Sequence, residues 1–235
     1  MTPETTPGGP LADPRDMFAA HTMFRREFGL MPALVRAVTP GDKPRATLVA
    51  DHIALMSGVL SQHHLAEGRH IWPRLRERCP QQCGPLVDVM EDQRHAIRTR
   101  LLQVSKALPP WRDSASARAG GALAGAIDRL IAVITEHLAL EEERVVPLIV
   151  TYITDAEHAA RAQEHAAHIP PGIPPGKLLT VFGMIMYHGD PAVSDTILAQ
   201  MPVEVQPAIK DLAVQAYAAY ATDLYGTPAP PRATG

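Results

Sequence analysis

Three pairs of histidine and glutamate, each with its members four residues apart, constrain this chain more than any other feature of its sequence. The pairs are His63 with Glu67, Glu91 with His95, and His137 with Glu141. A further histidine, His21, lies in a segment of the same apolar character. Residues four apart are neighbours on one face of an α-helix. The pattern therefore predicts helices that carry metal-binding side chains on one face.

Pro and Gly divide the sequence into long segments with helical periodicity, and no segment shows the alternation of a half-buried strand. The expected helices cover about residues 13–38, 45–78, 85–108 and 115–152. Pro73 is expected to kink the second helix, and Pro109-Pro110 to end the third. We therefore predict an all-α protein. Short connections favour antiparallel neighbours, and thus an up-down-up-down four-helix bundle.

Ionisable residues interrupt the apolar stripes of these helices. On the first helix His21 shares a stripe with Phe24, and on the second His63 and Glu67 follow Leu60. An uncompensated carboxylate in a core would cost several kcal/mol, so it needs a proton, an ion pair or a cation. Because four helices supply such residues to one interior, we predict a buried metal site. Imidazole and carboxylate donors suit iron, manganese or zinc, and their number favours two ions.

Composition and charge exclude several other classes of protein. The 235-residue chain is 46% hydrophobic and 20% charged, with a net charge of -3, as in an ordinary globular protein. It has no long run of Lys and Arg that would attract nucleic acid or anionic lipid. It also has no export signal and no apolar run of about 18 residues. We therefore expect neither nucleic acid nor a membrane as partner, and a cytoplasmic location.

The stretch HHLAE at residues 63–67, followed by IWP at residues 71–73, resembles the HHxxE…WP signature of the hemerythrin-like, or HHE cation-binding, domains. His137 with Glu141-Glu142 is similar to the HxxxEE helix of that family, and His21 matches the single histidine of its first helix. The resemblance covers residues 13–152. It implies a non-heme diiron centre, in which two iron ions bind dioxygen, nitric oxide or peroxide.

Carried over from this resemblance, the metal ligands are expected at His21, His63, Glu67, His95, His137 and Glu141. Oxygen-carrying hemerythrins have HxxxH on the third helix, whereas this chain reads EDQRH over residues 91–95, so Glu91 is a candidate ligand in place of the first histidine. A carboxylate there would add negative charge, which favours ferric iron and weakens reversible oxygenation. His64, rotated about 100° from His63 around the helix, is interpreted as a flanking group.

Beyond residue 152 the sequence predicts an extension of further helices. Thr154 and Glu157 form a capping box that opens a helix through His168, and the linker IPPGIPPGK follows. Later helices are expected over residues 177–187, from Asp190-Pro191, and over residues 204–225. The histidines of the first of these helices are interpreted as surface residues: His158, His165 and His168.

The chain is thus expected to have four parts. They are a disordered segment over residues 1–12, the bundle over 13–152, the helical extension over 153–226 and a disordered tail over 227–235. The extension resembles that of actinobacterial-type hemerythrin-like proteins. We expect it to cover an apolar face of the bundle or to form a homodimer interface.

Three functions are compatible with these ligands. The one that we favour is the binding of dioxygen or a related small oxidant for sensing, storage or scavenging. The alternatives are a diiron oxidase or a peroxidase- or catalase-like enzyme, and an iron-handling protein without redox chemistry. The residues alone predict a buried dinuclear metal site, and the dioxygen ligand is implied by the family resemblance.

Overall fold

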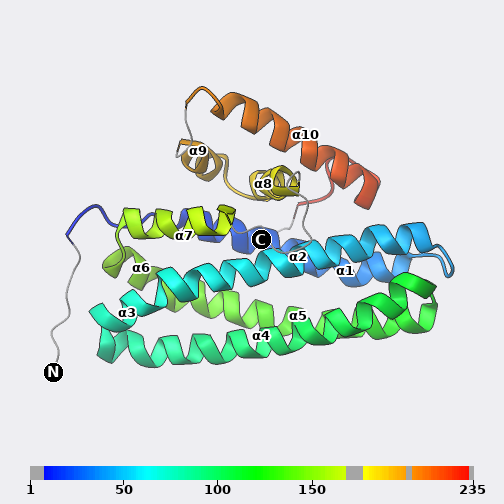
Figure 1. Cartoon of the computed structure of the whole chain (residues 1–235), viewed down its shortest axis with the longest axis horizontal. Helices are drawn as coiled ribbons and strands as arrows, with labels where there is room; N and C mark the ends of the chain where they lie inside the picture. The colour runs from blue at the N-terminus through cyan, green and yellow to red at the C-terminus, as the bar shows by residue number, and fades with distance from the viewer. Residues whose placement is uncertain (1–7, 168–176, 200–202, 233–235) are drawn as a thin grey trace. The chain divides into compact units, whose positions relative to one another are not determined.

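The computed structural model describes residues 8–167, 177–199 and 203–232, which form helices and the loops between them (Figure 1). The helices of the first part are α1 (Arg15–Ala37), α2 (Lys43–His70), α3 (Trp72–Arg78), α4 (Pro80–Ser114), α5 (Ala117–Leu140), the π-helix η1 (Glu141–Val145), α6 (Val146–Tyr152) and α7 (Asp155–Ala167). After the linker come α8 (Lys177–His188), α9 (Pro191–Ala199) and α10 (Gln206–Tyr225). The prediction of an all-α protein is confirmed.

The chain divides into two compact units. The first comprises Met1–Pro14 with Phe28–Pro170, and the second comprises Arg15–Glu27 with Pro171–Gly235. Helix α1 runs without interruption across the boundary between Glu27 and Phe28. Its two halves therefore belong to different units, which the sequence pattern did not indicate.

In the first unit, α2, α4, α5 and the second half of α1 enclose the apolar core. Arg36 of α1 pairs with Asp128 of α5 at 2.6 Å. A Cβ added at Gly120 of α5 would lie 3.0 Å from the Trp111 ring of α4 and 3.7 Å from Val35 of α1. The core side chains of α2 and α5 include Met56, Leu60, Ile127, Leu130 and Ile134. The up-down-up-down order of these helices stays a prediction.

Prolines shape the second and third long helices differently. Near Pro73, where a kink was expected, the helix is divided, because α2 ends at His70 and α3 begins at Trp72. The expected end at Pro109-Pro110 is wrong, since α4 continues to Ser114. Buried Trp111 anchors this last turn, and the Ser114 hydroxyl donates to the carbonyl of Pro110 at 2.7 Å. Packing and this side-chain bond offset the hydrogen bonds that the two prolines cannot make.

The segment expected as one helix over residues 115–152 is interrupted. Helix α5 ends at Leu140, and a π-helical segment, Glu141–Val145, precedes α6. Pro147 lies at the start of α6. A proline ring clashes with the carbonyl four residues earlier, here that of Glu143, so regular α-helix is disfavoured at this point. π-Helical insertions of this kind are often found at functional sites.

The predicted capping box is confirmed at the start of α7. The backbone N–H of Thr154 donates to Glu157 at 3.0 Å, and the N–H of Glu157 donates to the Thr154 hydroxyl at 3.3 Å. The N-terminal segment expected to be disordered is partly ordered. Ala12 donates to the carbonyl of Ile153 at 3.0 Å, and Asp155 donates to that of Pro10 at 2.9 Å. Residues 1–7 and the IPPG repeats lie outside the described residues.

The second unit contains the three helices predicted after the linker, α8, α9 and α10. Helices α8 and α10 pack so closely at Gly183 that a Cβ added there would lie 2.2 Å from the carbonyl oxygen of Ala213. Glu27 of α1 is fully buried in this unit and accepts hydrogen bonds from Tyr225 at 2.5 Å and Arg26 at 2.7 Å. None of the helices in the described ranges combines the length and apolar composition needed to cross a bilayer.

Candidate metal centre

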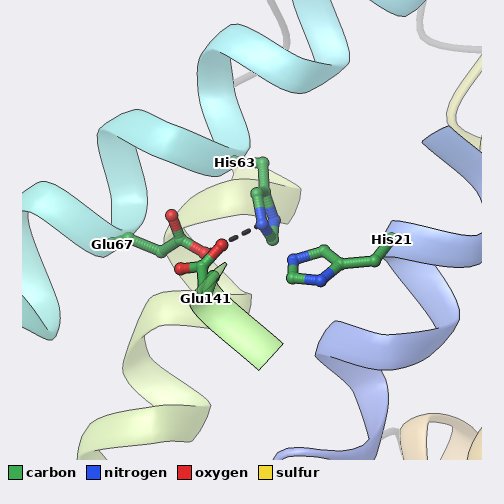
Figure 2. Close-up of side chains that lie close together, drawn as sticks. All are labelled: His21, His63, Glu67 and Glu141. Atoms are coloured by element: carbon green, nitrogen blue, oxygen red, sulfur yellow. Dashed lines mark ion pairs between the residues drawn. The ribbon is translucent and has the colours of Figure 1, made fainter. Parts of the chain in front are cut away.

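Helix α2 carries the first two residues of the candidate site one turn apart. His63 and Glu67 are both buried, and His63 Nε2 lies 2.8 Å from Glu67 Oε1, the pair marked by the dashed line in Figure 2. The side chains continue the buried stripe of Val59 and Leu60. Spacing by four residues therefore brings an imidazole and a carboxylate together inside the core.

The junction of α5 and η1 supplies the next two residues. His137 lies in the last turn of α5, and Glu141 is the first residue of the π-helix. Both are fully buried, with 3.7 Å between His137 Nε2 and Glu141 Oε2. One ligand atom from each of His63, Glu67 and Glu141 lies within 4.8 Å of the others. The structure thus assembles one buried group from α2 and the α5–η1 junction.

Arg94 of α4 is a buried cation beside this group. Its Nη2 lies 3.0 Å from Glu67 Oε2 and donates to the carbonyl of His64. Its guanidinium also lies 5.0 Å from the centre of the Trp72 ring. Although burial alone raises the pKa of Glu67, His63 and Arg94 together lower it well below its usual value. Glu67 is therefore ionised in the protein interior.

Glu141 has the opposite electrostatic environment. Burial, followed by the charge of Glu67, raises its pKa well above the usual value. Two carboxylates that share a buried site cannot both ionise easily. A cation placed between Glu67 and Glu141 would remove this conflict and would allow both to be anionic.

Two polar side chains flank His137. Gln93 Oε1 lies 3.2 Å from His137 Nδ1, within reach of a ring N–H, so Nε2 is left on the side of Glu141. Orientation of the outer imidazole nitrogen by such an acceptor is typical of metal-binding histidines. His64 packs edge-on against His137, with 4.9 Å between the ring centroids. Burial, with His137 next, lowers the pKa of His64 well below its usual value, so this ring is neutral at pH 7.

The sequence-predicted residues of α4 do not join this group. Glu91 is 53% exposed and pairs with Arg76 at 3.0 Å, and His95 is also exposed. The expectation that Glu91 and His95 face the bundle interior is therefore wrong. Arg94 occupies the inward position between them. The prediction rested on the one-turn spacing of Glu91 and His95 and on their comparison with the HxxxH of hemerythrins, and it did not take account of the apolar stripe of this helix.

That stripe could have identified the inward residue. The buried side chains of α4 include Val87, Met90, Ile97 and Val104, at heptad spacing, which places residue 94 on the same face. An arginine at such a position was not considered as part of the site. The pairing of this arginine with Glu67 of α2 is set by tertiary packing, and no sequence pattern predicts it.

His21, the remaining predicted ligand, lies in the first half of α1 and is fully buried. Figure 2 draws it with His63, Glu67 and Glu141. Of the histidines interpreted as surface residues, His158 is instead buried and lies 3.3 Å from Arg161. The side chain of His165 and the whole of His168 lie outside the described structure.

The donor chemistry of this group fits a metal cation. Imidazole nitrogen and carboxylate oxygen bind divalent metals at about 2.1 Å, so donors on one ion lie up to about 4.2 Å apart. The spread of 4.8 Å within the group is close to this value. The fold and the group together define an all-α protein with a buried histidine and carboxylate site suited to a cation.

Comparison with known proteins agrees with this description. A sequence model of the hemerythrin HHE cation binding domain matches residues 14–167, more than half of the chain. The chain therefore belongs to the hemerythrin HHE cation-binding family. Neither the curated proteins nor the solved structures that were searched gave a match.

Proposed function

We propose that this protein binds non-heme iron in the buried group and takes up dioxygen or a related small oxidant there. The observation that carries the proposal is the convergence of His63, Glu67 and Glu141 in a chain of the HHE family. Mixed imidazole and carboxylate ligation suits iron, and the group contains no thiolate that would favour a softer metal ion. When bound, iron would supply the redox chemistry that these side chains lack.

His137 and His21 are the further donors in this proposal. His137 is held by Gln93 in an orientation that leaves Nε2 for a metal. His21 is separated by two helical turns from Phe28, where α1 enters the first unit. Because α1 is one continuous helix with about 3.6 residues per turn, His21 and Phe28 lie on the same face. Both residues are buried.

A groove between α2 and α4 offers a route for a small ligand. Its volume is about 780 Å³, and its lining includes His64 and Arg94, which contact His137 and Glu67. Exposed Glu91 and His95 also line the groove. His64 lines this groove and packs against His137, so its ring is placed to contact a small ligand that enters.

The test is anaerobic loading of the protein with ferrous iron, followed by exposure to air with the visible spectrum recorded in time. A long-lived oxygenated species that disappears when oxygen is removed would support a binding protein. Immediate oxidation with consumption of added peroxide would instead indicate an oxidase or a peroxidase-like enzyme. Failure to retain iron would contradict the proposal.

Two iron ions per chain is the count that the family resemblance implies. That count relied on donors from α4, and the described α4 residues bring Arg94 to the group in place of a histidine or carboxylate. Nitric oxide and peroxide are the other small ligands that the proposal includes. Formation of a homodimer and a cytoplasmic location stay predictions from the sequence.

A further inference from the structure

Arg94 is the buried charged residue that α4 brings to the candidate group. It is 7% exposed and reaches Glu67 from the α4 side of the group. Glu91, one turn earlier, and His95, the next residue, are both exposed. Within the described part of α4, Gln93 contacts His137 but brings no histidine or carboxylate to the group.

The contact with Arg94 also occupies one oxygen of Glu67. Oε1 of this carboxylate faces His63, and Oε2 faces Arg94 Nη2 at 3.0 Å. A carboxylate that bridges two metal ions must give one oxygen to each of them. With Oε2 engaged by a guanidinium, a second metal ion at this oxygen would lie beside a fixed positive charge, which disfavours it.

The net charge of the group also disfavours a second divalent ion. The group contains two carboxylates, Glu67 and Glu141, beside the guanidinium of Arg94. One divalent ion and the guanidinium together already exceed the charge of both carboxylates by one unit, whereas a second divalent ion would leave an excess of three. A buried excess of that size is strongly disfavoured, because burial removes the water that would screen it.

Arg94 is also fixed in this position. Besides Glu67, it donates to the carbonyl of His64 and lies over the ring of Trp72. Displacing it for a second ion would leave a charged group without these partners in the protein interior. We infer that Arg94 substitutes for a second metal ion and that this chain binds a single ion in the buried group. The inference rests on the proposed iron site.

The inference is tested by counting iron bound to the full-length protein. Metal-free wild type is titrated anaerobically with ferrous iron, passed through a desalting column and analysed for iron per chain. Oxidised samples are then examined by electron paramagnetic resonance. An isolated ferric ion gives a high-spin signal, whereas two coupled ferric ions in one centre are silent. We expect one iron per chain and the signal of an isolated ion.

Two variants test the role of Arg94 directly. Arg94→His removes the charge and adds an imidazole, so we expect iron per chain to rise from one to two. Arg98→His is the matched control, because it adds the same imidazole one turn later at an exposed position of α4 and should leave the count at one. Circular dichroism establishes that each variant is folded.

The outcomes separate this inference from the proposed function. Two irons per wild-type chain would overturn the single-ion inference and leave the iron site intact. A folded Arg94→His protein that still binds one iron would overturn the role given to Arg94. Absence of iron from the wild type would contradict the proposed function itself. The wild-type count remains decisive even when Arg94→His does not fold.

Discussion

Arg94 of α4 donates a hydrogen bond to Glu67 of α2 across 3.0 Å in the bundle interior. His63 and this ion pair together keep the pKa of Glu67 low despite its complete burial. A carboxylate of the candidate metal group is therefore held in its anionic form by neighbouring side chains. Because the charge is already present, a cation entering the group need not displace a proton from Glu67.

The first prediction concerns which histidines hold iron. His63→Ala removes an imidazole from the buried group and is expected to lower the bound iron at least tenfold, since few donors surround the site. His95→Ala is the matched control: this histidine is exposed, and its loss should leave iron binding unchanged. Both are measured by metal analysis after desalting. Equal iron loss in the two variants would contradict the structural placement of α4.

The second prediction concerns Glu157, which ties α7 to α3. Its carboxylate accepts from Arg78 at 2.7 Å and from Arg74 at 2.9 Å. The hydrogen bond with Arg78 lowers the pKa of Glu157 far below its ordinary value, although burial opposes this shift. Glu157→Gln should reduce the free energy of unfolding at pH 7 by about 2 kcal/mol, the size of charged hydrogen bonds.

The sign of the pH dependence follows from this lowered pKa. The stabilisation by Glu157 is complete above the unfolded-state pKa of about 4.3 and is lost as the pH falls towards the folded-state value. Urea denaturation of wild type and Glu157→Gln should therefore differ more at pH 7 than at pH 3. Exposed Glu143→Gln serves as the control, with little change at either pH. A difference that grows on acidification would refute the argument.

The third prediction compares two helical glycines. Gly183→Ala would place a Cβ 2.2 Å from the carbonyl oxygen of Ala213 and 2.7 Å from Tyr217 Cβ, so α8 and α10 must separate. The expected loss of stability is about 1–3 kcal/mol or more. Gly121→Ala meets no atom within 4 Å in α5 and should stabilise the helix by about 0.5–1 kcal/mol. Thermal unfolding of both variants checks the opposite signs.

The fourth prediction concerns tyrosines of the second unit. Tyr225 donates to the buried carboxylate of Glu27, whereas Tyr187 donates to the backbone carbonyl of Pro230, both at 2.5 Å. Hydrogen bonds to charged acceptors contribute about 1.5–3 kcal/mol, against about 0.5–1.5 kcal/mol for neutral ones. Tyr225→Phe should therefore destabilise the protein more than Tyr187→Phe in chemical denaturation. The reverse order would contradict the greater strength assigned to the hydrogen bond with Glu27.

Local sequence patterns predicted most helices and the residues of α2 in the site. The i, i+4 spacing of His63 with Glu67 and of His137 with Glu141 follows from helix geometry alone, and the capping box of Thr154 depends only on neighbouring residues. The pattern failed at Pro109-Pro110, where burial of Trp111 outweighs the local preference to end the helix.

The sequence by itself determined that this chain is all-α and that His63 with Glu67, and His137 with Glu141, share a helix face, because helical periodicity is a local property. Only the tertiary structure decided that the inward arginine of α4 meets Glu67 of α2. Arg94 faces inward because its stripe is shared with Met90 and Ile97, and its ion pair joins residues that are far apart in the sequence. The rotation of one helix against its neighbours is set by packing, which no local pattern encodes.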